Sequence, residues 1–248
     1  MTHQTSSNRP NAADFSWQVD DVFGRIASRY DKLSDVFSFG IHRLWKRRVA
    51  QRIAAENWST LLDGATGTGD IILRVARKSS ADKRIIIASD VSKKMLAIAE
   101  QPLHEHKGMV SLRLLDAQDM PSIGTDSIDA YSISLGLKIC NRRLAIQEAL
   151  RILKPGGRLI ILEASNIPWP LLNRAYLAYM SVCMPALGWL ATGGDASAYK
   201  YLLQGIRDFP TAEELARELE SYGFEGVEFE RLSFGIVAIH TARKPGKS

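Results

Sequence analysis

The chain has 248 residues, 46% of them hydrophobic and 24% charged, which are the proportions of an ordinary globular protein. Its length accommodates one large α/β domain with an insertion, or at most two small domains. The formal net charge of +5 suits contact with anionic surfaces, but we find no recognition motif for nucleic acid and no apolar run of the ~18 residues that a membrane span requires.

The N-terminal region is first polar and then helical in pattern. Residues 1–17 are predicted to be a disordered lead, and residues 18–245 to form a single domain. Beyond the lead, apolar side chains recur at the spacing of one helix face, at Val19, Val22, Phe23, Ile26, Ala27 and Tyr30. We expect this face to dock onto the main domain rather than to bind a membrane.

A basic stretch with interleaved apolar residues follows, from Arg43 to Arg48. Two interpretations remain open for it: a surface that rests on an anionic membrane, or solvated charge on an ordinary helix. His42, next to this stretch, is a candidate substrate contact, although a lone histidine more often satisfies a local hydrogen bond.

The segment from Leu61 to Asp70, LLDGATGTGD, predicts a strand, a glycine turn and the start of a helix. Gly67 and Gly69 allow positive φ and a close approach of the backbone to a ligand, as in α/β sheets that bind nucleotide-like ligands. The segment lacks the third glycine of a dinucleotide fingerprint and the lysine of a phosphate-binding loop. It resembles motif I of the S-adenosylmethionine-dependent methyltransferases, with Ala65 where that motif has its first glycine. The alternative is a turn that needs small residues only for its geometry.

Acidic residues end three successive predicted strands: Asp63 the first, Asp90 the second and Asp116 the third. A carboxylate at the second tip can accept hydrogen bonds from both ribose hydroxyls of an adenosine, and the third tip reaches the adenine amino group. A Ser89–Asp90 turn could instead only cap the helix that begins near Ser92. Three acids at three neighbouring tips favour the adenosine interpretation.

Strands and helices continue to alternate, which predicts a doubly wound, mostly parallel α/β sheet. The predicted strands are 84–90, 110–117, 127–134 and 158–163, and a helix at 142–153 ends at a turn formed by residues 154–157.

The aromatic-rich segment 165–209 interrupts this alternation. We expect it to form a lid over an apolar, aromatic substrate; the alternative is a helical pair whose aromatic residues are core. A capping box at Thr211 and Glu214 starts the next helix. Closing strands at 225–231 and 233–241 are expected to form an antiparallel pair at the sheet edge.

Longer stretches look like the ubiquinone/menaquinone biosynthesis C-methyltransferases. They are Ile26–Asp31, Ser38–Arg47, Leu153–Leu159, Ala198–Leu202, Arg207–Pro210, Gly223–Phe224 and Phe234–His240. The resemblance implies a class I methyltransferase fold: a seven-stranded, mostly parallel, Rossmann-like sheet with N-terminal helices and a helical insertion after the fifth strand. It also implies an S-adenosylmethionine-dependent enzyme that methylates a ring carbon of a prenylated quinol, such as a demethylmenaquinol or a ubiquinol precursor.

The resemblance also assigns site residues. The family's cofactor contacts fall on Thr68, Asp90, Asp116, Ala117 and Ser134, beside Gly67 of the turn. A ring carbon attacks a sulfonium methyl only when it is electron-rich, as beside an ionised phenol, and a cation can lower that phenol's pKa. We therefore predict catalytic roles for Lys138 and Tyr30 and substrate contacts for His42 and Tyr199; His240 is a further candidate for proton transfer.

The chain departs from the family after the fourth predicted strand. The family typically has S-F-G-L-R-N, whereas residues 134–139 here are SLGLKI. Lys138 keeps a positive charge without the planar fork of arginine, and Ile139 removes an amide. We expect this departure to affect the substrate and to leave cofactor binding untouched.

Alternatives to quinol methylation are a methyltransferase of a soluble aromatic or polyketide metabolite, and a relative that binds S-adenosylmethionine without turnover. Cys140 and Cys183 have neither metal-ligand spacing nor the density of a disulfide scaffold, which favours a reducing compartment. We expect a cytoplasmic protein with transient contact to the inner membrane face, no nucleic-acid partner and no metal. A homo-oligomer remains open.

Overall fold

The computed structural model describes residues 34–36, 38–79, 84–192 and 197–246. The predicted lead 1–17 and the predicted helix from Val19 to Tyr30 lie outside the described residues.

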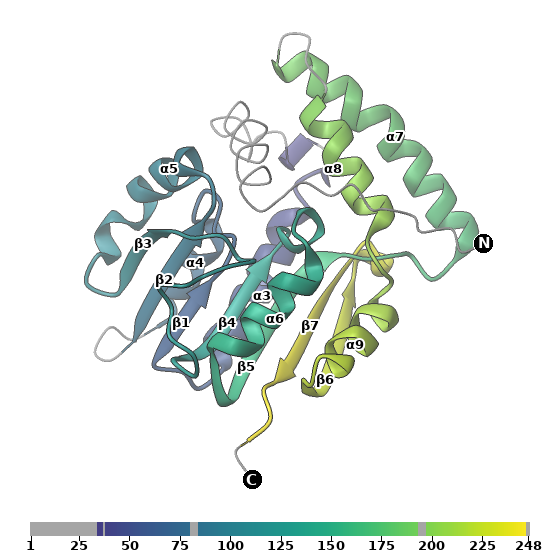
Figure 1. The fold of residues 1–248 in the computed structure, drawn as a ribbon. Helices are drawn as coiled ribbons and strands as arrows, with labels where there is room; N and C mark the ends of the chain where they lie inside the picture. The colour runs from purple at the N-terminus through teal and green to yellow at the C-terminus, as the bar shows by residue number, and fades with distance from the viewer. Residues whose placement is uncertain (1–33, 37, 80–83, 193–196, 247–248) are drawn as a thin grey trace, which may run out of the picture.

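One seven-stranded sheet forms the centre of the molecule, in the order β3-β2-β1-β4-β5-β7-β6 (Figure 1). Its strands are β1 (Thr60–Asp63), β2 (Ile85–Asp90), β3 (Val110–Leu114), β4 (Ile128–Ser134), β5 (Leu153–Ala164), β6 (Glu225–Leu232) and β7 (Val237–Arg243). The first five strands pair in parallel, and β7 lies antiparallel between β5 and β6. The predicted fold class and the antiparallel closing pair are confirmed.

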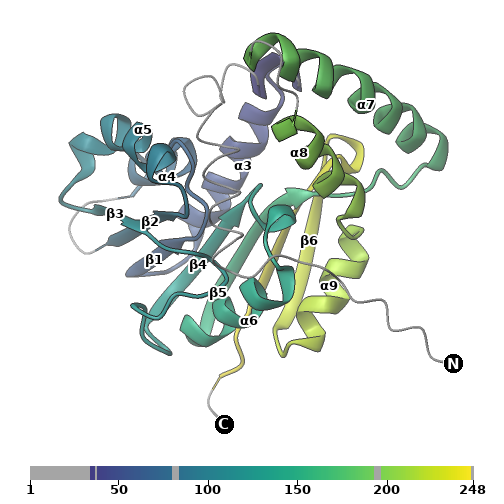
Figure 2. The ribbon, with the colours of Figure 1, turned by 45° about the horizontal axis from the view of Figure 1, so that its top comes forward.

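Helices cover both faces of the sheet (Figure 2). They are α3 (His42–Ala55), α4 (Asp70–Ala76), α5 (Lys93–Leu103), α6 (Arg142–Ile152) and α9 (Ala212–Ser221). Neighbouring strand residues point to opposite faces, so Leu61 and Ile160 join the core under α3 and α4, whereas Leu62 and Ile161 join the core under α6 and α9. Because both faces of the sheet centre are buried, a central strand such as β2 is mostly apolar, whereas the edge strand β3 is largely exposed and carries Ser111 and Arg113.

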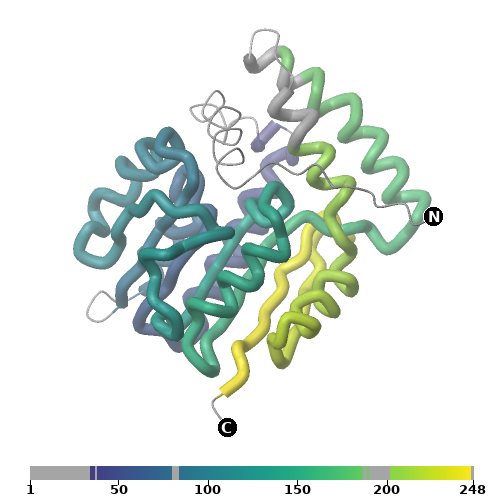
Figure 3. Tube along the Cα trace, in the orientation of Figure 1, coloured from purple at the N-terminus to yellow at the C-terminus, as the bar shows by residue number. Residues whose placement is uncertain are grey.

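The insertion after β5 forms two helices, α7 (Pro170–Thr192) and α8 (Ser197–Asp208). The chain runs outward along α7 and returns along α8 beyond the carboxyl ends of the parallel strands (Figure 3). A small core joins the pair to α5 through Met95, Met180, Met184, Leu202 and Leu203. Segment 165–209 is therefore largely helical; its role as a lid stays a prediction.

Three predicted boundaries are wrong. Residues 154–157 are not a turn after the helix but part of β5, which follows α6 directly; Gly156 has φ +77° there. The last strand begins at Val237 rather than at 233, because Ser233–Gly235 form a 3₁₀ turn with positive φ angles. The third strand ends at Leu114, before Asp116. The predicted capping box at Thr211 and Glu214 is confirmed. The N-cap of α5 is Ser92, whose side chain accepts the Met95 N–H, and not the Ser89–Asp90 turn.

Candidate active site

A pocket of about 890 Å³ lies at the carboxyl ends of the parallel strands. Every residue predicted to bind the cofactor lines it: Gly67, Thr68, Asp90, Asp116, Ala117 and Ser134. Gly67, Thr68, Asp116 and Ala117 come from the loops after β1 and β3, and Asp90 and Ser134 are the last residues of β2 and β4. They meet because parallel strands place their carboxyl ends at one edge. We refer to this space as the cofactor pocket.

The glycine turn has the geometry that close ligand approach requires. Gly67 and Gly69 have φ angles of +57° and +84°, and a Cβ built on Gly67 would meet no atom within 4 Å. The Gly67 N–H donates to Asp90 Oδ2 at 2.8 Å, so the tip of β2 holds the turn after β1. The methyl group of Ala65 fits because Gly136 has no side chain: a Cβ there would lie 2.5 Å from the Ala65 Cβ.

The polar groups of this pocket match an adenosyl ligand. Asp90 Oδ1 also accepts the Ser92 N–H at 2.9 Å, and carboxylate oxygens accept several hydrogen bonds, so ribose hydroxyls can bind in addition. Asp116 is oriented by the Gln118 backbone N–H at 2.9 Å. Among the described residues, the buried Ser134 hydroxyl has no hydrogen-bond partner, which leaves it available to a ligand. The residues present therefore fit S-adenosylmethionine.

Asp63, the acid at the tip of β1, does not line the pocket. It is buried beneath the glycine turn, where Thr66 Oγ1 and Ser132 Oγ each donate to its carboxylate at 2.6 Å. Burial raises the pKa of Asp63 to about 6, against the two hydrogen bonds that lower it. Asp63 supports the loop, and only Asp90 and Asp116 of the three tip acids face the ligand space.

The Asp63 shift predicts a pH dependence of stability. The folded-state pKa lies above the ordinary value of 3.8, so this carboxyl group stabilises the fold most below pH 4, and that contribution is lost as the pH rises through 6. A shift of about 2 units corresponds to about 3 kcal/mol. Urea unfolding of wild type and Asp63→Asn at pH 4 to 7 tests this. The unfolding free energy of the wild type should fall relative to that of the variant as the pH rises. A difference in unfolding free energy that does not change with pH would contradict the raised pKa of Asp63.

A second and larger pocket, of about 1210 Å³, adjoins the first. Its walls come from α3, α7, α8 and the residues around β5 and β7, and they are mainly apolar and aromatic: Phe39, Ile41, Trp45, Leu135, Tyr176, Tyr179, Met180, Met184, Leu202, Ile206, Ile236 and Val237. We refer to it as the apolar pocket. Burial in this pocket raises the pKa of Tyr176 to about 12, so that phenol stays protonated.

The structure brings two further predicted residues into the apolar pocket, His42 and Lys138. His42 is buried, with Nδ1 at 2.9 Å from Ser38 Oγ. Lys138 Nζ lies 3.0 Å from Glu163 Oε1, in an ion pair whose side chains are 7% and 1% exposed. Tyr30 and the side chain of Tyr199 lie outside the described residues. The roles of these four residues stay predictions.

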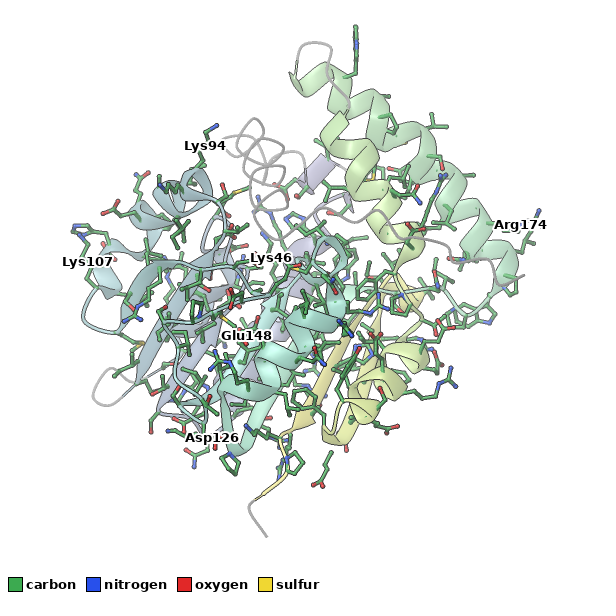
Figure 4. The ribbon with its side chains drawn as sticks, viewed as in Figure 1. Lys46, Lys94, Lys107, Asp126, Glu148 and Arg174 are labelled. Atoms are coloured by element: carbon green, nitrogen blue, oxygen red, sulfur yellow. The ribbon has the colours of Figure 1, made fainter. Side chains whose placement is uncertain are left out.

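Sequence reasoning missed Lys46, which lines both pockets and forms an ion pair with Asp70 (Nζ to Oδ2, 3.3 Å). Figure 4 shows it in the middle of the molecule, above the strands. The helical spacing could have identified Lys46, because it lies on the same face of α3 as the apolar residues Val49, Ala50 and Ile53. The buried residues of α3 are His42, Lys46, Val49, Ala50 and Ile53.

Several other side chains of α3 form contacts within the molecule. Arg43 pairs with Asp35, and both Arg48 and Arg52 pair with Glu230. The Trp45 indole N–H donates to Ser233 Oγ at 2.8 Å. These contacts help to dock α3 onto the sheet. Leu44 and Arg47 of the stretch are exposed, and its contact with a membrane stays a prediction.

Two other expectations are corrected. Ile139 lines the cofactor pocket, so the departure from the family sequence reaches a wall of that pocket and does not concern the substrate alone. His240 lies beneath α9, where its Nε2 is 2.9 Å from the Ala212 carbonyl oxygen, and it lines neither pocket. Burial lowers the pKa of His240, which keeps the imidazole neutral.

Comparisons with known proteins agree with this architecture. The model of the ubiE/COQ5 methyltransferase family matches residues 11–244. The ubiquinone/menaquinone biosynthesis C-methyltransferase UbiE of Sinorhizobium fredii is 37% identical over 91% of this chain and 88% of its own length. The mitochondrial 2-methoxy-6-polyprenyl-1,4-benzoquinol methylase of Caenorhabditis elegans is 34% identical over 95% of this chain and 82% of its own.

Solved structures share the fold. The [4+2]-cyclase SpnF has a TM-score of 0.64 at 23% identity, covering 94% of this chain and 97% of its own. An S-adenosylmethionine-dependent methyltransferase from Thermotoga maritima has a TM-score of 0.63 at 20% identity, covering 91% and 99%. At these identities the structural similarity is evidence for the fold alone. The family model covers nearly the whole chain and is therefore evidence for the family. The chain therefore belongs to the ubiE/COQ5 methyltransferase family and is an S-adenosylmethionine-dependent methyltransferase.

Proposed function

We propose that this protein transfers a methyl group from S-adenosylmethionine to a ring carbon of a prenylated hydroquinol. The observation that carries the proposal is the pair of adjoining pockets: a cofactor pocket with Asp90 and Asp116 on its walls, and a larger apolar pocket that shares Lys46 and Leu135 with it. The names of the relatives, which refer to ubiquinone, menaquinone and a polyprenyl benzoquinol, support the same substrate class.

The residues of one pocket bind the cofactor, and those of the other bind the substrate. When bound, the cofactor supplies an electrophilic methyl group. Asp90 and Asp116 hold its adenosine end, and the glycine turn allows the backbone to approach it. The aromatic and aliphatic walls of the apolar pocket bind a ring and part of a prenyl chain and exclude water. Holding the ring carbon in line with the methyl group supplies much of the catalysis through proximity and orientation.

The direct test is methylation of a demethylated prenyl quinol by the purified protein with S-adenosylmethionine, followed by mass spectrometry of the extracted quinones. We expect a product one methylene group heavier and an equal amount of S-adenosylhomocysteine. Methylation of small soluble phenols without methylation of the prenylated quinol would favour the soluble-metabolite alternative. Binding of the cofactor without any product would favour the non-catalytic one.

We further propose that the outer face of α7 rests on the membrane that holds such a substrate. Among the described residues, no helix is both long enough and apolar enough to cross a bilayer. The exposed positions of α7 are nonetheless mostly apolar, with Leu171, Val182 and Trp189 at 82%, 70% and 56% exposure. Arg174 is the only charged residue of α7, and it points away from the molecule (Figure 4).

This face continues to the mouth of the apolar pocket. Tyr179 of α7 stacks on Phe39 with ring centroids 6.5 Å apart, and Phe39 is 80% exposed. An exposed apolar surface of this kind, next to a positive charge, suits the interface of an anionic membrane. A prenylated quinol could then enter the apolar pocket from the bilayer without crossing water.

We therefore expect the protein to float with anionic liposomes in a density gradient, more at low salt than at high salt. The double variant Leu171→Glu/Val182→Glu should float much less, because it places two charges on the inserted face. Ile85→Glu is the matched control: Ile85 is 56% exposed at the opposite end of β2, and this variant should float as the wild type does. Equal flotation of the wild type and the α7 variant would contradict a role for this face.

A further inference from the structure

Lys46 occupies the boundary between the two pockets. Within the part of the chain that the structure describes, Lys46 and Leu135 are the residues that line both. Leu135 contributes only apolar atoms and a backbone held at φ +58°. Lys46 is buried at 7% exposure and ends in an ammonium group. In the proposed reaction, the methyl group and the ring carbon must meet at this boundary.

Lys46 shares one of its partners, the Asp70 carboxylate, with Arg74. Asp70 Oδ2 lies 3.3 Å from Lys46 Nζ, but the same carboxylate also binds Arg74 Nε at 2.9 Å, so two cations share one anion. Their influence holds the pKa of Asp70 below its usual value, although burial acts to raise it. Lys138, the other cation of the apolar pocket, forms a buried ion pair with Glu163.

Other ionisable groups also face this region. His42 lies one turn before Lys46 on α3, and Asp35 is close enough for Lys46 to help lower its pKa, after the larger effect of Arg43. Asp90 and Asp116 lie on the walls of the cofactor pocket.

We propose that Lys46 is a catalytic residue whose ammonium group contacts the ring oxygen next to the carbon that is methylated, and holds that oxygen as a phenolate. The inference rests on the proposed function. The phenolic proton passes to solvent water as the quinol enters the pocket. The ring carbon then forms a bond to the methyl group as the sulfur–carbon bond breaks and its electron pair stays on sulfur. The proton on that carbon is afterwards lost to solvent water, which restores the aromatic ring. A cation that stabilises the phenolate lowers the activation free energy of methyl transfer.

The competing role for Lys46 is binding of the cofactor's carboxylate, and the two roles predict different results for Lys46→Met. A contact with the substrate oxygen predicts an affinity for S-adenosylhomocysteine within about threefold of wild type by calorimetry, and a fall in turnover of about 100-fold at saturating cofactor. A cofactor contact predicts a loss of affinity of tenfold or more, with turnover largely recovered at saturation. The second result would overturn the proposal.

A spectroscopic probe tests the phenolate directly and does not depend on turnover. A nitrophenol bound to the complex with S-adenosylhomocysteine can be titrated by its phenolate absorbance. The probe should ionise at least one pH unit lower in wild type than in Lys46→Met, which is a tenfold shift in the equilibrium. Arg48→Met, which removes an exposed cation of the same helix, is the matched control and should titrate as wild type.

Two outcomes of the probe experiment overturn the proposal. One is that the bound nitrophenol ionises at the same pH in wild type and in Lys46→Met. The other is a shift that appears in Lys138→Met/Glu163→Gln and not in Lys46→Met, which would make Lys138 the activating cation. If wild type methylates no prenylated quinol yet the Lys46 shift is seen, the proposed substrate is wrong and the role of Lys46 stands.

Discussion

The Lys138→Met variant should lose about 3–5 kcal/mol of unfolding free energy, the range observed when one partner of a buried ion pair is removed. Glu163 is 1% exposed, and its carboxylate accepts the Lys138 ammonium, the Lys138 backbone N–H at 3.0 Å and the Ala164 N–H at 2.7 Å. Without the ammonium, a buried negative charge remains among neutral groups. Urea unfolding at pH 7 measures the loss.

A second substitution separates charge from packing. Lys138→Met combined with Glu163→Gln removes both charges and should recover most of the lost stability, because a neutral amide costs less to bury than an unpaired carboxylate. If the double variant instead loses the sum of the unfolding free energies lost by the two single variants, the unpaired charge is not the cause of the instability of Lys138→Met.

The same double variant tests the predicted catalytic role of Lys138 in a stable protein. Lys138 lines the apolar pocket and not the cofactor pocket. We therefore expect a lower turnover of the quinol with cofactor affinity within about twofold of wild type. Unchanged turnover would mean that the Lys138–Glu163 pair is purely structural.

Asp90→Ala should weaken binding of S-adenosylmethionine by about 10- to 150-fold, which corresponds to the ~1.5–3 kcal/mol of a hydrogen bond to a charged group. Asp90 combines two tasks that the substitution removes together. Its carboxylate faces the cofactor pocket, and it anchors the glycine turn through the Gly67 N–H at 2.8 Å. Calorimetry with the purified variant measures the affinity, and circular dichroism verifies that it is folded.

Asp90→Asn distinguishes the two tasks. It keeps one side-chain oxygen, which can still accept the Gly67 N–H, but it offers fewer acceptors to the ribose. We expect an affinity between those of wild type and Asp90→Ala. Wild-type affinity in a folded Asp90→Ala variant would remove Asp90 from the site.

The sequence by itself determined the sheet and the cofactor edge. Apolar runs that end in Asp90 and Asp116, and a turn built on Gly67 and Gly69, are local patterns, and parallel strands necessarily gather their carboxyl ends at one edge. The residues predicted to bind the cofactor therefore met in one pocket. Strand ends were less predictable: residues 154–157 carry proline and glycine, yet they form an irregularity within β5. Leu153 before them and Arg158 after them both pair with β4.

Only the tertiary structure decided what each charged residue does. Lys46 and Arg48 are two positions apart on one helix. The helical spacing places Lys46 with the apolar positions, but it identifies neither the pockets that Lys46 lines nor the partner of Arg48. One points into the junction of two pockets, and the other forms an exposed ion pair with Glu230 of β6, 182 positions away in the chain. Likewise Asp63 and Asp90 end neighbouring strands, but Asp63 is enclosed by hydroxyl donors beneath the turn. Burial and charge pairing depend on contacts between distant segments, so they become visible only when those segments are brought together.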